Sequence, residues 1–233
     1  MALDVYVGSL TRYYAGDWEN VADKAAREKG EQTSRGAFVG RSTDITRIGS
    51  RLLEWRNTLA RSLGDNITEP LEWDESAQAP HFTARPGWDG FGSLVLWAAY
   101  AEHPSMRAPP VLPEAWDDDP ALVRCNADGF RSRFSHLVRN VELWLPCAFR
   151  FTFEGEGVDG RRIVVGSVTT LAAQLADLNA ATWKVDGDGV ASWGRRPPMA
   201  EALLEQRARY AFAVMTDLVR QAVDHGLPMK LDY

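Results

Sequence analysis

Two short segments combine a tryptophan with several carboxylates, a combination that could bind a basic protein surface. An aromatic ring can fill a pocket on a partner, while carboxylates attract a basic surface and speed its approach. The competing interpretation is a solvated acidic loop whose tryptophans cover the core, because runs of surface charge often have no partner. We expect these two segments to supply the partner-binding residues, namely Glu72, Trp73, Asp74, Glu75, Trp116, Asp117, Asp118 and Asp119.

The net charge of the chain, −6, is unevenly distributed along the sequence. Residues 64–119 hold eleven acidic and two basic residues, a net charge of −9, whereas the remainder carries +3. A general nucleic-acid binder normally has a basic surplus, and docking on anionic lipid needs basic clusters. The charge pattern argues against nucleic-acid and membrane partners and favours a basic protein partner.

Motifs for ligand binding are incomplete. Residues 155–160 match Gly-x-Gly-x-x-Gly, but a strand pattern follows where a dinucleotide site needs the N-terminus of a helix. Residues 186–189, Asp-Gly-Asp-Gly, begin like a calcium loop, but position twelve is Pro197 instead of glutamate. Both segments are therefore expected to be turns.

The four histidines give no metal signature. No two of them have the i, i+4 spacing of a helical zinc site, and no Cys/His cluster is visible, so neither a metal nor a cofactor is expected. Glu102 and His103 are neighbours in a predicted helix, where adjacent side chains point apart. The alternative to a binding protein is a small hydrolase or transferase, with its site assembled around Asp89, His81 or His103 and with Arg12 or Tyr13 nearby.

The two tryptophan-containing segments lie in predicted loops, 65–86 and 105–118, between more regular elements. Hydrophobic periodicity and capping residues predict helices over 17–29, 44–63, 90–103, from 119 onward, 129–145, from 167 onward, and 197–225. Alternating apolar residues predict strands over 3–7, 147–154, 161–166 and 229–233, with a second small hairpin over 183–193.

This order of elements predicts an α+β fold with mixed helices, a small and largely antiparallel sheet, and a long C-terminal helix. Strands and helices do not alternate regularly, as they would in a doubly wound sheet. The helices on both sides of 105–118 are amphipathic enough to share one core. We therefore expect residues 1–233 to form a single domain, with a possible weak boundary near 105–118.

The compartment is inferred from the cysteines and the N-terminus. Two cysteines, Cys125 and Cys147, are too few for a disulfide scaffold. The first residues show no basic region followed by an apolar stretch, and the longest strongly apolar run, 94–101, is far shorter than the roughly 20 residues of a membrane span. A cytoplasmic protein with reduced thiols is expected.

Two stretches, residues 3–14 and 86–104, resemble a family of uncharacterised bacterial proteins of similar length. That resemblance implies no established activity and therefore no functional residues. In its general character, acidic, tryptophan-rich and without a catalytic signature, the chain is also similar to bacterial immunity proteins that neutralise toxins. This second likeness implies a non-catalytic protein that occludes a basic toxin or effector.

Overall fold

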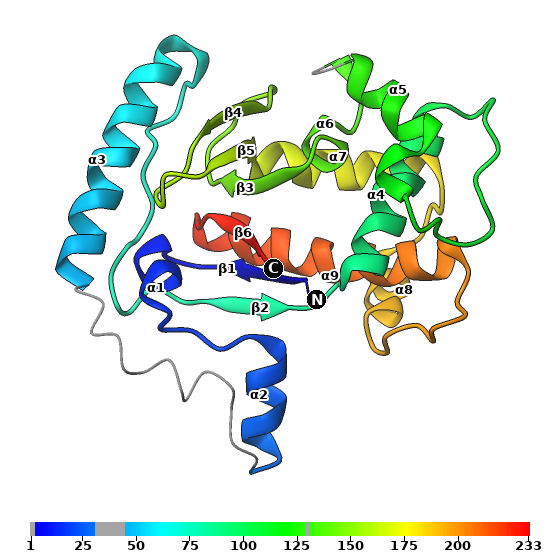
Figure 1. Cartoon of the computed structure of the whole chain (residues 1–233), viewed down its shortest axis with the longest axis horizontal. Helices are drawn as coiled ribbons and strands as arrows, with labels where there is room; N and C mark the ends of the chain where they lie inside the picture. Colours follow the sequence, from blue (N-terminus) through cyan, green and yellow to red (C-terminus); the bar gives the residue numbers. More distant parts are fainter. Residues whose placement is uncertain (1–2, 31–44, 129–130) are drawn as a thin grey trace.

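The structure is a computed structural model that describes residues 3–30, 45–128 and 131–233. These residues form a six-stranded sheet with helices on both faces (Figure 1). All neighbouring strands are antiparallel except β3 and β5, which are parallel. The predicted α+β fold with a largely antiparallel sheet is confirmed. In spatial order the strands are β2 (Phe82–Ala84), β1 (Asp4–Val7), β6 (Met229–Asp232), β3 (Val141–Leu145), β5 (Arg162–Ser167) and β4 (Phe153–Glu156).

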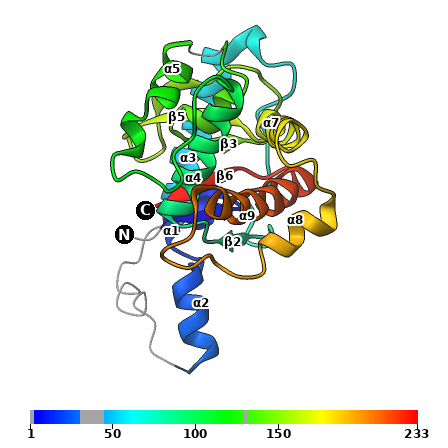
Figure 2. The same cartoon turned by 90° about the vertical axis from the view of Figure 1, so that its right-hand side faces the viewer.

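The helices divide between the two faces of the sheet. The first face is covered mainly by α4, α7 and α9, and the second by α1 and α3. Figure 2 shows α7 and α8 on the side of the molecule opposite the C-terminus. The helices are α1 (Leu10–Ala15), α2 (Val21–Glu28), α3 (Ile45–Leu63), α4 (Trp88–Glu102), α5 (Pro120–Asp128), α6 (Ser135–Val138), α7 (Val168–Ala181), α8 (Gly187–Trp193) and α9 (Leu204–His225), with short 3-10 turns η2 (Gly64–Asn66) and η3 (Trp116–Asp118).

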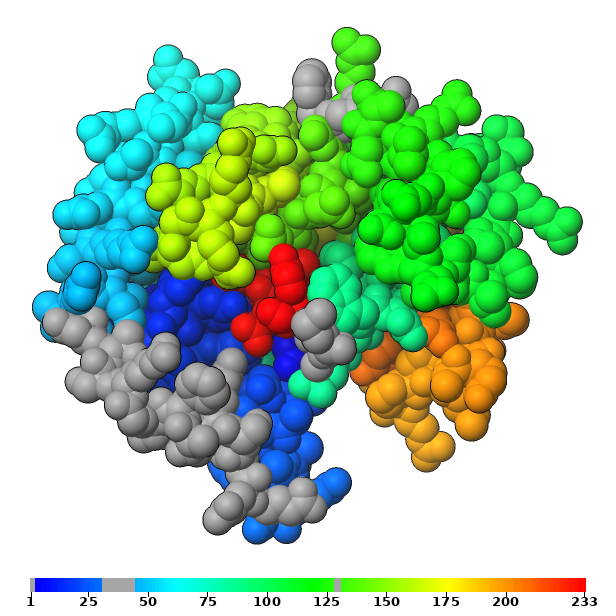
Figure 3. Space-filling model, in the orientation of Figure 1, coloured from blue at the N-terminus to red at the C-terminus, as the bar shows by residue number. Residues whose placement is uncertain are grey.

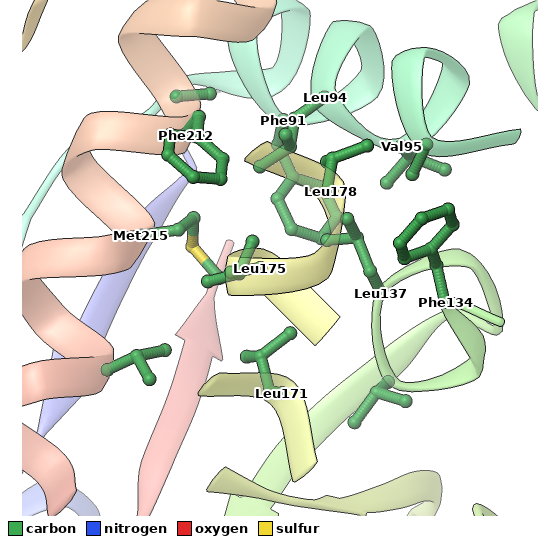
Figure 4. Close-up of a cluster of buried hydrophobic side chains, with 14 of the residues drawn as sticks. Phe91, Leu94, Val95, Phe134, Leu137, Leu171, Leu175, Leu178, Phe212 and Met215 are labelled. Carbon is green, nitrogen blue, oxygen red and sulfur yellow. The ribbon is translucent and has the colours of Figure 1, made fainter. Parts of the chain in front are cut away.

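The larger hydrophobic core lies between the sheet and α4, α6, α7 and α9. Successive strand residues point to opposite faces, so Val5 and Val7 of β1 enter this core while Tyr6 faces the other side. Figure 4 shows apolar side chains from the four helices converging, among them Leu94, Leu137, Leu175 and Phe212. The same cluster includes Leu122, which follows the segment 105–118, so residues on both sides of that segment share one core.

The smaller core lies on the opposite face. Leu10 of α1 and Leu52 of α3 pack against Leu143 of β3 and Ile163 of β5. Trp73, from the coil between α3 and β2, completes the cluster. This second core fixes the position of the first tryptophan-containing segment.

Several local predictions are confirmed. The N-terminal and C-terminal strands form and pair with each other, and α3 ends at Leu63, just before Gly64. The Ser167 hydroxyl accepts a hydrogen bond from the Thr170 amide and so caps α7. Asp44, the first residue of the helix predicted over 44–63, lies outside the described residues.

The predicted helix over 129–145 is wrong in the residues that the structure describes. Among the described residues of this range only the four-residue α6 is α-helical, and Val141–Leu145 is strand β3. The apolar spacing suited a helix, but Asn140 adopts a left-handed φ of 52°, which interrupts any helix there. The following residues then pair with both β5 and β6.

The predicted strand over 147–154 is also largely wrong, since β4 begins only at Phe153. The backbone carbonyls of Cys147 and Phe149 accept hydrogen bonds from the Ser167 and Thr170 hydroxyls, each at 2.6 Å. These side-chain bonds from the start of α7 take the place of a strand ladder. The β4–β5 hairpin itself forms as predicted.

Two predictions over residues 183–225 need correction. The predicted hairpin over 183–193 is helix α8, because Asp186 caps a helix by accepting from the Gly189 amide at 2.9 Å. The C-terminal helix begins at Leu204 instead of Pro197, and the Arg207 guanidinium donates to the Ala202 carbonyl, which holds the preceding loop.

The starts of two other predicted helices need correction. The helix predicted over 17–29 starts at Val21 with Asn20 as its cap, and a separate helix, α1, precedes it. Helix α4 starts at Trp88, two residues before the start predicted at residue 90, with Gly87 at the N-cap position.

Candidate functional site

The first tryptophan-containing segment is built into the smaller core. The Trp73 side chain is buried and lies edge-on to Trp55, with ring centroids 6.5 Å apart. The Arg56 guanidinium lies over the Trp73 ring at 5.2 Å from its centroid, a cation–π arrangement. Trp73 therefore stabilises the packing of α3 and is not presented to a partner.

The Glu75 carboxylate is engaged by the start of helix α1. Its two oxygens accept hydrogen bonds from the backbone amides of Leu10 at 3.1 Å and Thr11 at 2.7 Å, and Trp73 Nε1 also donates to it. A carboxylate in this position satisfies the unpaired amides of the first helical turn. Glu72 and Asp74 stay exposed, and the bond that Asp74 accepts from the Ser76 backbone amide lowers the pKa of Asp74.

The second segment forms the 3-10 turn η3 and is anchored at both ends. Trp116 is half-buried and packs against Gly92 of α4 so closely that a Cβ on Gly92 would lie 2.7 Å from the indole. Asp119 is buried and accepts from the Ala121 amide at 2.9 Å, which caps α5, and from the Tyr100 hydroxyl at 3.0 Å. Burial, followed by this bond to Asp119, raises the pKa of Tyr100 to about 12.

Three carboxylates of the second segment remain on the surface, and we call them the acidic ridge: Glu114, Asp117 and Asp118. All three are exposed. None of them makes a side-chain hydrogen bond or ion pair with any residue in the described ranges. Val123, one turn into α5, is 53% exposed and adds apolar surface beside the turn. The ridge thus lies at a turn that is anchored at both ends, and its charges are not neutralised by the described part of the chain.

The two segments do not form one surface. The first packs on α3 and the second on α4 and α5, which lie on opposite sides of the molecule in Figure 1. Among the eight predicted residues, the structure separates buried or capping groups from exposed ones. The exposed members are Glu72, Asp74, Asp117 and Asp118.

The residues of the alternative enzymatic site are also scattered. Asp89 is at the start of α4, where it forms an ion pair with Arg207. His103 follows the end of the same helix, about 20 Å away at 1.5 Å per residue. His81 lies near α1, with Nδ1 3.1 Å from an Arg12 nitrogen, and burial and the Arg12 charge lower its pKa. Tyr13 instead donates to Asp232.

One cluster of potential ligands was not visible in the sequence. Ligand atoms of Glu102, His103 and Cys125 all lie within 4.8 Å of one another. The expectation that Glu102 and His103 point apart is therefore wrong, and so is the absence of a Cys/His cluster. His103 precedes a proline and leaves the helix, with φ −116° and ψ 66°, so the angular spacing of helical neighbours does not apply to it.

Lys230 is a second group that the sequence analysis did not single out. It is 2% exposed, on strand β6, with Tyr6 and Leu143 as its neighbours across the sheet. Its ammonium group lies 5.3 Å from the centroid of the Tyr13 ring, and burial lowers its pKa. Perturbed lysines mark functional sites in some proteins, but at this burial a substrate has no access. The signal in the sequence was one lysine at an alternating position of a short apolar strand.

The C-terminal residues of β6 border a hollow on this face of the molecule. In Figure 3 they are red and lie between the blue N-terminal segment and the yellow-green residues near 155–165. Tyr13 Oη donates to Asp232 Oδ1 at 2.8 Å, and Tyr233 Oη donates to Glu142 at 2.8 Å. These bonds tie the end of the chain to its neighbours.

Four surface cavities are lined mainly by residues that were not predicted to bind or react. The largest, about 610 Å³, is a mainly apolar groove between α7, α8 and α9. Cavities of about 530 and 450 Å³ flank the loop around Pro197, and one of about 410 Å³ lies between α3 and β4. Among the residues predicted to bind or react, only Asp89 lines any of these four.

No helix in the described ranges combines the length and apolar character that crossing a bilayer requires. No protein-family model, curated protein or solved structure matches the chain.

Proposed function

We propose that the protein is a non-catalytic binding module whose acidic ridge docks on a basic protein, as an immunity-type protein would dock on a toxin or effector in the cytoplasm. The observation that supports the proposal most is that Asp117 and Asp118 are exposed, without a partner among the described residues, on a turn anchored at both ends. Trp116 fixes the turn against α4, and Asp119 fixes its end at the start of α5. A preorganised surface loses little conformational entropy on binding.

The docking surface is narrower than the sequence pattern predicts. Exposed carboxylates steer a basic partner and favour association at low ionic strength. Glu114, Asp117 and Asp118 can do this, whereas Trp73 and Glu75 are used inside the protein. The exposed side chain of Val123 supplies apolar contact area next to the charges.

A titration against defined proteins tests the proposal. The proteins encoded by the genes directly beside that of this chain are purified and titrated into it by isothermal calorimetry at low and high salt. We expect one basic protein to bind, more weakly at high salt because exposed charges are screened. Asp117→Asn with Asp118→Asn should weaken binding about tenfold, equivalent to about 1.4 kcal/mol.

The matched control is Glu72→Gln with Asp74→Asn, which removes the same number of exposed charges from the first segment. This control should change the affinity less than about twofold, since neither residue belongs to the ridge. Absence of binding by every neighbouring gene product, or equal effects of the two double variants, would overturn the proposal. Co-expression that fails to relieve the toxicity of a bound toxin would overturn its immunity role.

A further inference from the structure

We propose that Glu102, His103 and Cys125 form a binding site for a divalent transition-metal ion of the zinc class. The three residues converge where the end of α4 meets α5, and their ligand atoms lie within 4.8 Å of one another. This site is separate from the acidic ridge and requires no protein partner. Its existence therefore does not depend on the proposed binding function.

The donor set selects the class of metal. A thiolate, an imidazole and a carboxylate are the common ligands of zinc, and three protein ligands leave a fourth position for water. Calcium and magnesium bind oxygen ligands almost exclusively, so a site with sulfur and nitrogen disfavours them. The chemistry of Cys125 and His103 therefore indicates a borderline-soft ion.

The carboxylate of Glu102 is already oriented. Its Oε2 accepts hydrogen bonds from the Ser132 hydroxyl at 2.7 Å and from the Arg133 backbone amide at 3.1 Å, and the Cys125 thiol lies 3.7 Å away. Its other oxygen, Oε1, has no hydrogen-bond partner among the described residues. Hydrogen bonds of this kind hold metal ligands in place and tune their affinity.

The imidazole of His103 supplies an independent observation. Its Nε2 is buried from solvent yet has no hydrogen-bond partner among the described residues. A buried polar atom without a partner costs about 1–3 kcal/mol. An ion bound between the three side chains would use a ring nitrogen of His103 and fix the orientation of the ring.

The spacing requires only a small adjustment. Bond lengths of about 2.0–2.3 Å at tetrahedral angles place zinc ligands roughly 3.3–3.7 Å apart. The observed limit of 4.8 Å therefore leaves about 1 Å to be closed, which a small side-chain rotation of His103 can supply while Glu102 keeps its hydrogen bonds. Cys125 comes from the buried face of α5, so its sulfur is held by the packing of that helix.

A nucleophilic role for the same cysteine fits less well. Cys125 is 0% exposed, and none of the four cavities described above is lined by it. Reactive cysteines are partly exposed, because a substrate must reach the sulfur.

Metal binding replaces the thiol proton by a metal–sulfur bond, so one proton leaves to solvent for each ion bound.

Cobalt(II) is the probe that tests the site, because a thiolate ligand gives it a charge-transfer absorption band in the near ultraviolet. The full-length chain, reduced and metal-free, is titrated with cobalt(II), and zinc is then added to displace it. We expect a saturable band at one ion per chain, its loss on adding zinc, and release of one proton per ion.

Variants assign the ligands. Cys125→Ser should abolish the thiolate band, while His103→Gln and Glu102→Gln should each weaken cobalt binding about tenfold or more. The matched control is Cys147→Ser, because Cys147 is equally buried and lies outside the cluster. Circular dichroism confirms that each variant is folded, and Cys125→Ala replaces Cys125→Ser if the serine variant unfolds.

The results separate this proposal from the proposed function. A band that persists in Cys125→Ser, or that disappears in Cys147→Ser, overturns the assignment, and so does the absence of saturable binding to the unmodified chain. Loss of partner binding in the ridge variants with an intact cobalt band would contradict neither claim. An intact ridge with no cobalt band would overturn the metal site alone.

Discussion

The two tryptophan-containing segments have nearly the same composition but differ in how deeply the tryptophan is buried. In the first, Trp73 is buried against α3 and Glu75 caps α1. In the second, Trp116 anchors a turn from which Asp117 and Asp118 project into solvent. The difference teaches that a carboxylate beside a tryptophan either accepts from a backbone amide or stays exposed to solvent, depending on whether an amide is within reach.

Replacement of the tryptophan should give the largest difference in stability between the two segments. Trp73→Ala should destabilise the protein by about 3–5 kcal/mol, because it opens a cavity in the smaller core. Trp116→Ala should cost less, about 1–2 kcal/mol, since that ring is only half-buried. Urea unfolding followed by circular dichroism measures both, and equal losses would contradict the distinction.

A buried histidine should make the stability of the protein depend on pH. Burial lowers the pKa of His136 from 6.5 to about 4, so the unfolded chain binds more protons between these values. Stability should therefore fall as the pH drops from 6.5 to 4, by up to about 3 kcal/mol. Urea unfolding at a series of pH values should show this fall in the free energy of unfolding for the native chain, and the fall should be largely absent in His136→Gln.

Gly92→Ala tests whether the ridge depends on its anchor. The new Cβ would lie 2.7 Å from the Trp116 indole, so the ring must move, at a cost of about 1–3 kcal/mol. The control is Gly49→Ala in α3, where no atom lies within 4 Å of the added Cβ and helix propensity predicts stabilisation of about 0.5–1 kcal/mol. Hydrogen exchange at residues 116–119 should accelerate only in Gly92→Ala.

The carboxylates of the first segment should contribute unequally to the stability of the fold. Glu75→Ala leaves the Leu10 and Thr11 amides without their acceptor and should cost about 1–3 kcal/mol. Glu72→Ala removes an exposed charge and should change the free energy of unfolding by no more than about 0.5 kcal/mol. A comparable loss in both variants would show that Glu75 does not act as a cap.

The smallest difference in stability is expected between two aspartate variants of the second segment. Asp119→Ala removes the cap of α5 and should cost about 0.5–2 kcal/mol. Asp117→Ala should be neutral within about 0.5 kcal/mol, because its carboxylate has no described partner. Thermal unfolding of the two variants side by side measures the contrast, and a destabilised Asp117→Ala would mean that the ridge has a structural role.

Periodic apolar patterns made much of the fold predictable from the sequence. The helix 45–63, the buried helix near 90–103 and the two terminal strands follow from spacing and terminating residues alone. The apolar spacing of residues 134–145 fits a helix, so the prediction there was wrong. Asn140 has a left-handed φ, and the residues after it form a strand because they pair with β5 and β6. Those partners are distant in the sequence.

The candidate sites were less predictable than the fold. Cys125 meets Glu102 and His103 only because α5 packs on α4, and adjacent residues converge only because His103 leaves the helix before a proline. The sequence also could not reveal that Glu75 faces the amides of α1, a contact spanning more than sixty residues. Side-chain pairing across such distances has no local signal.

Hydrogen exchange of the complex with the basic protein from a neighbouring gene tests the central distinction most directly. If the ridge is the docking surface, amides of residues 116–123 become protected on binding, while those of residues 72–79 exchange at unchanged rates. Protection of 72–79 with no change at 116–123 would contradict the account.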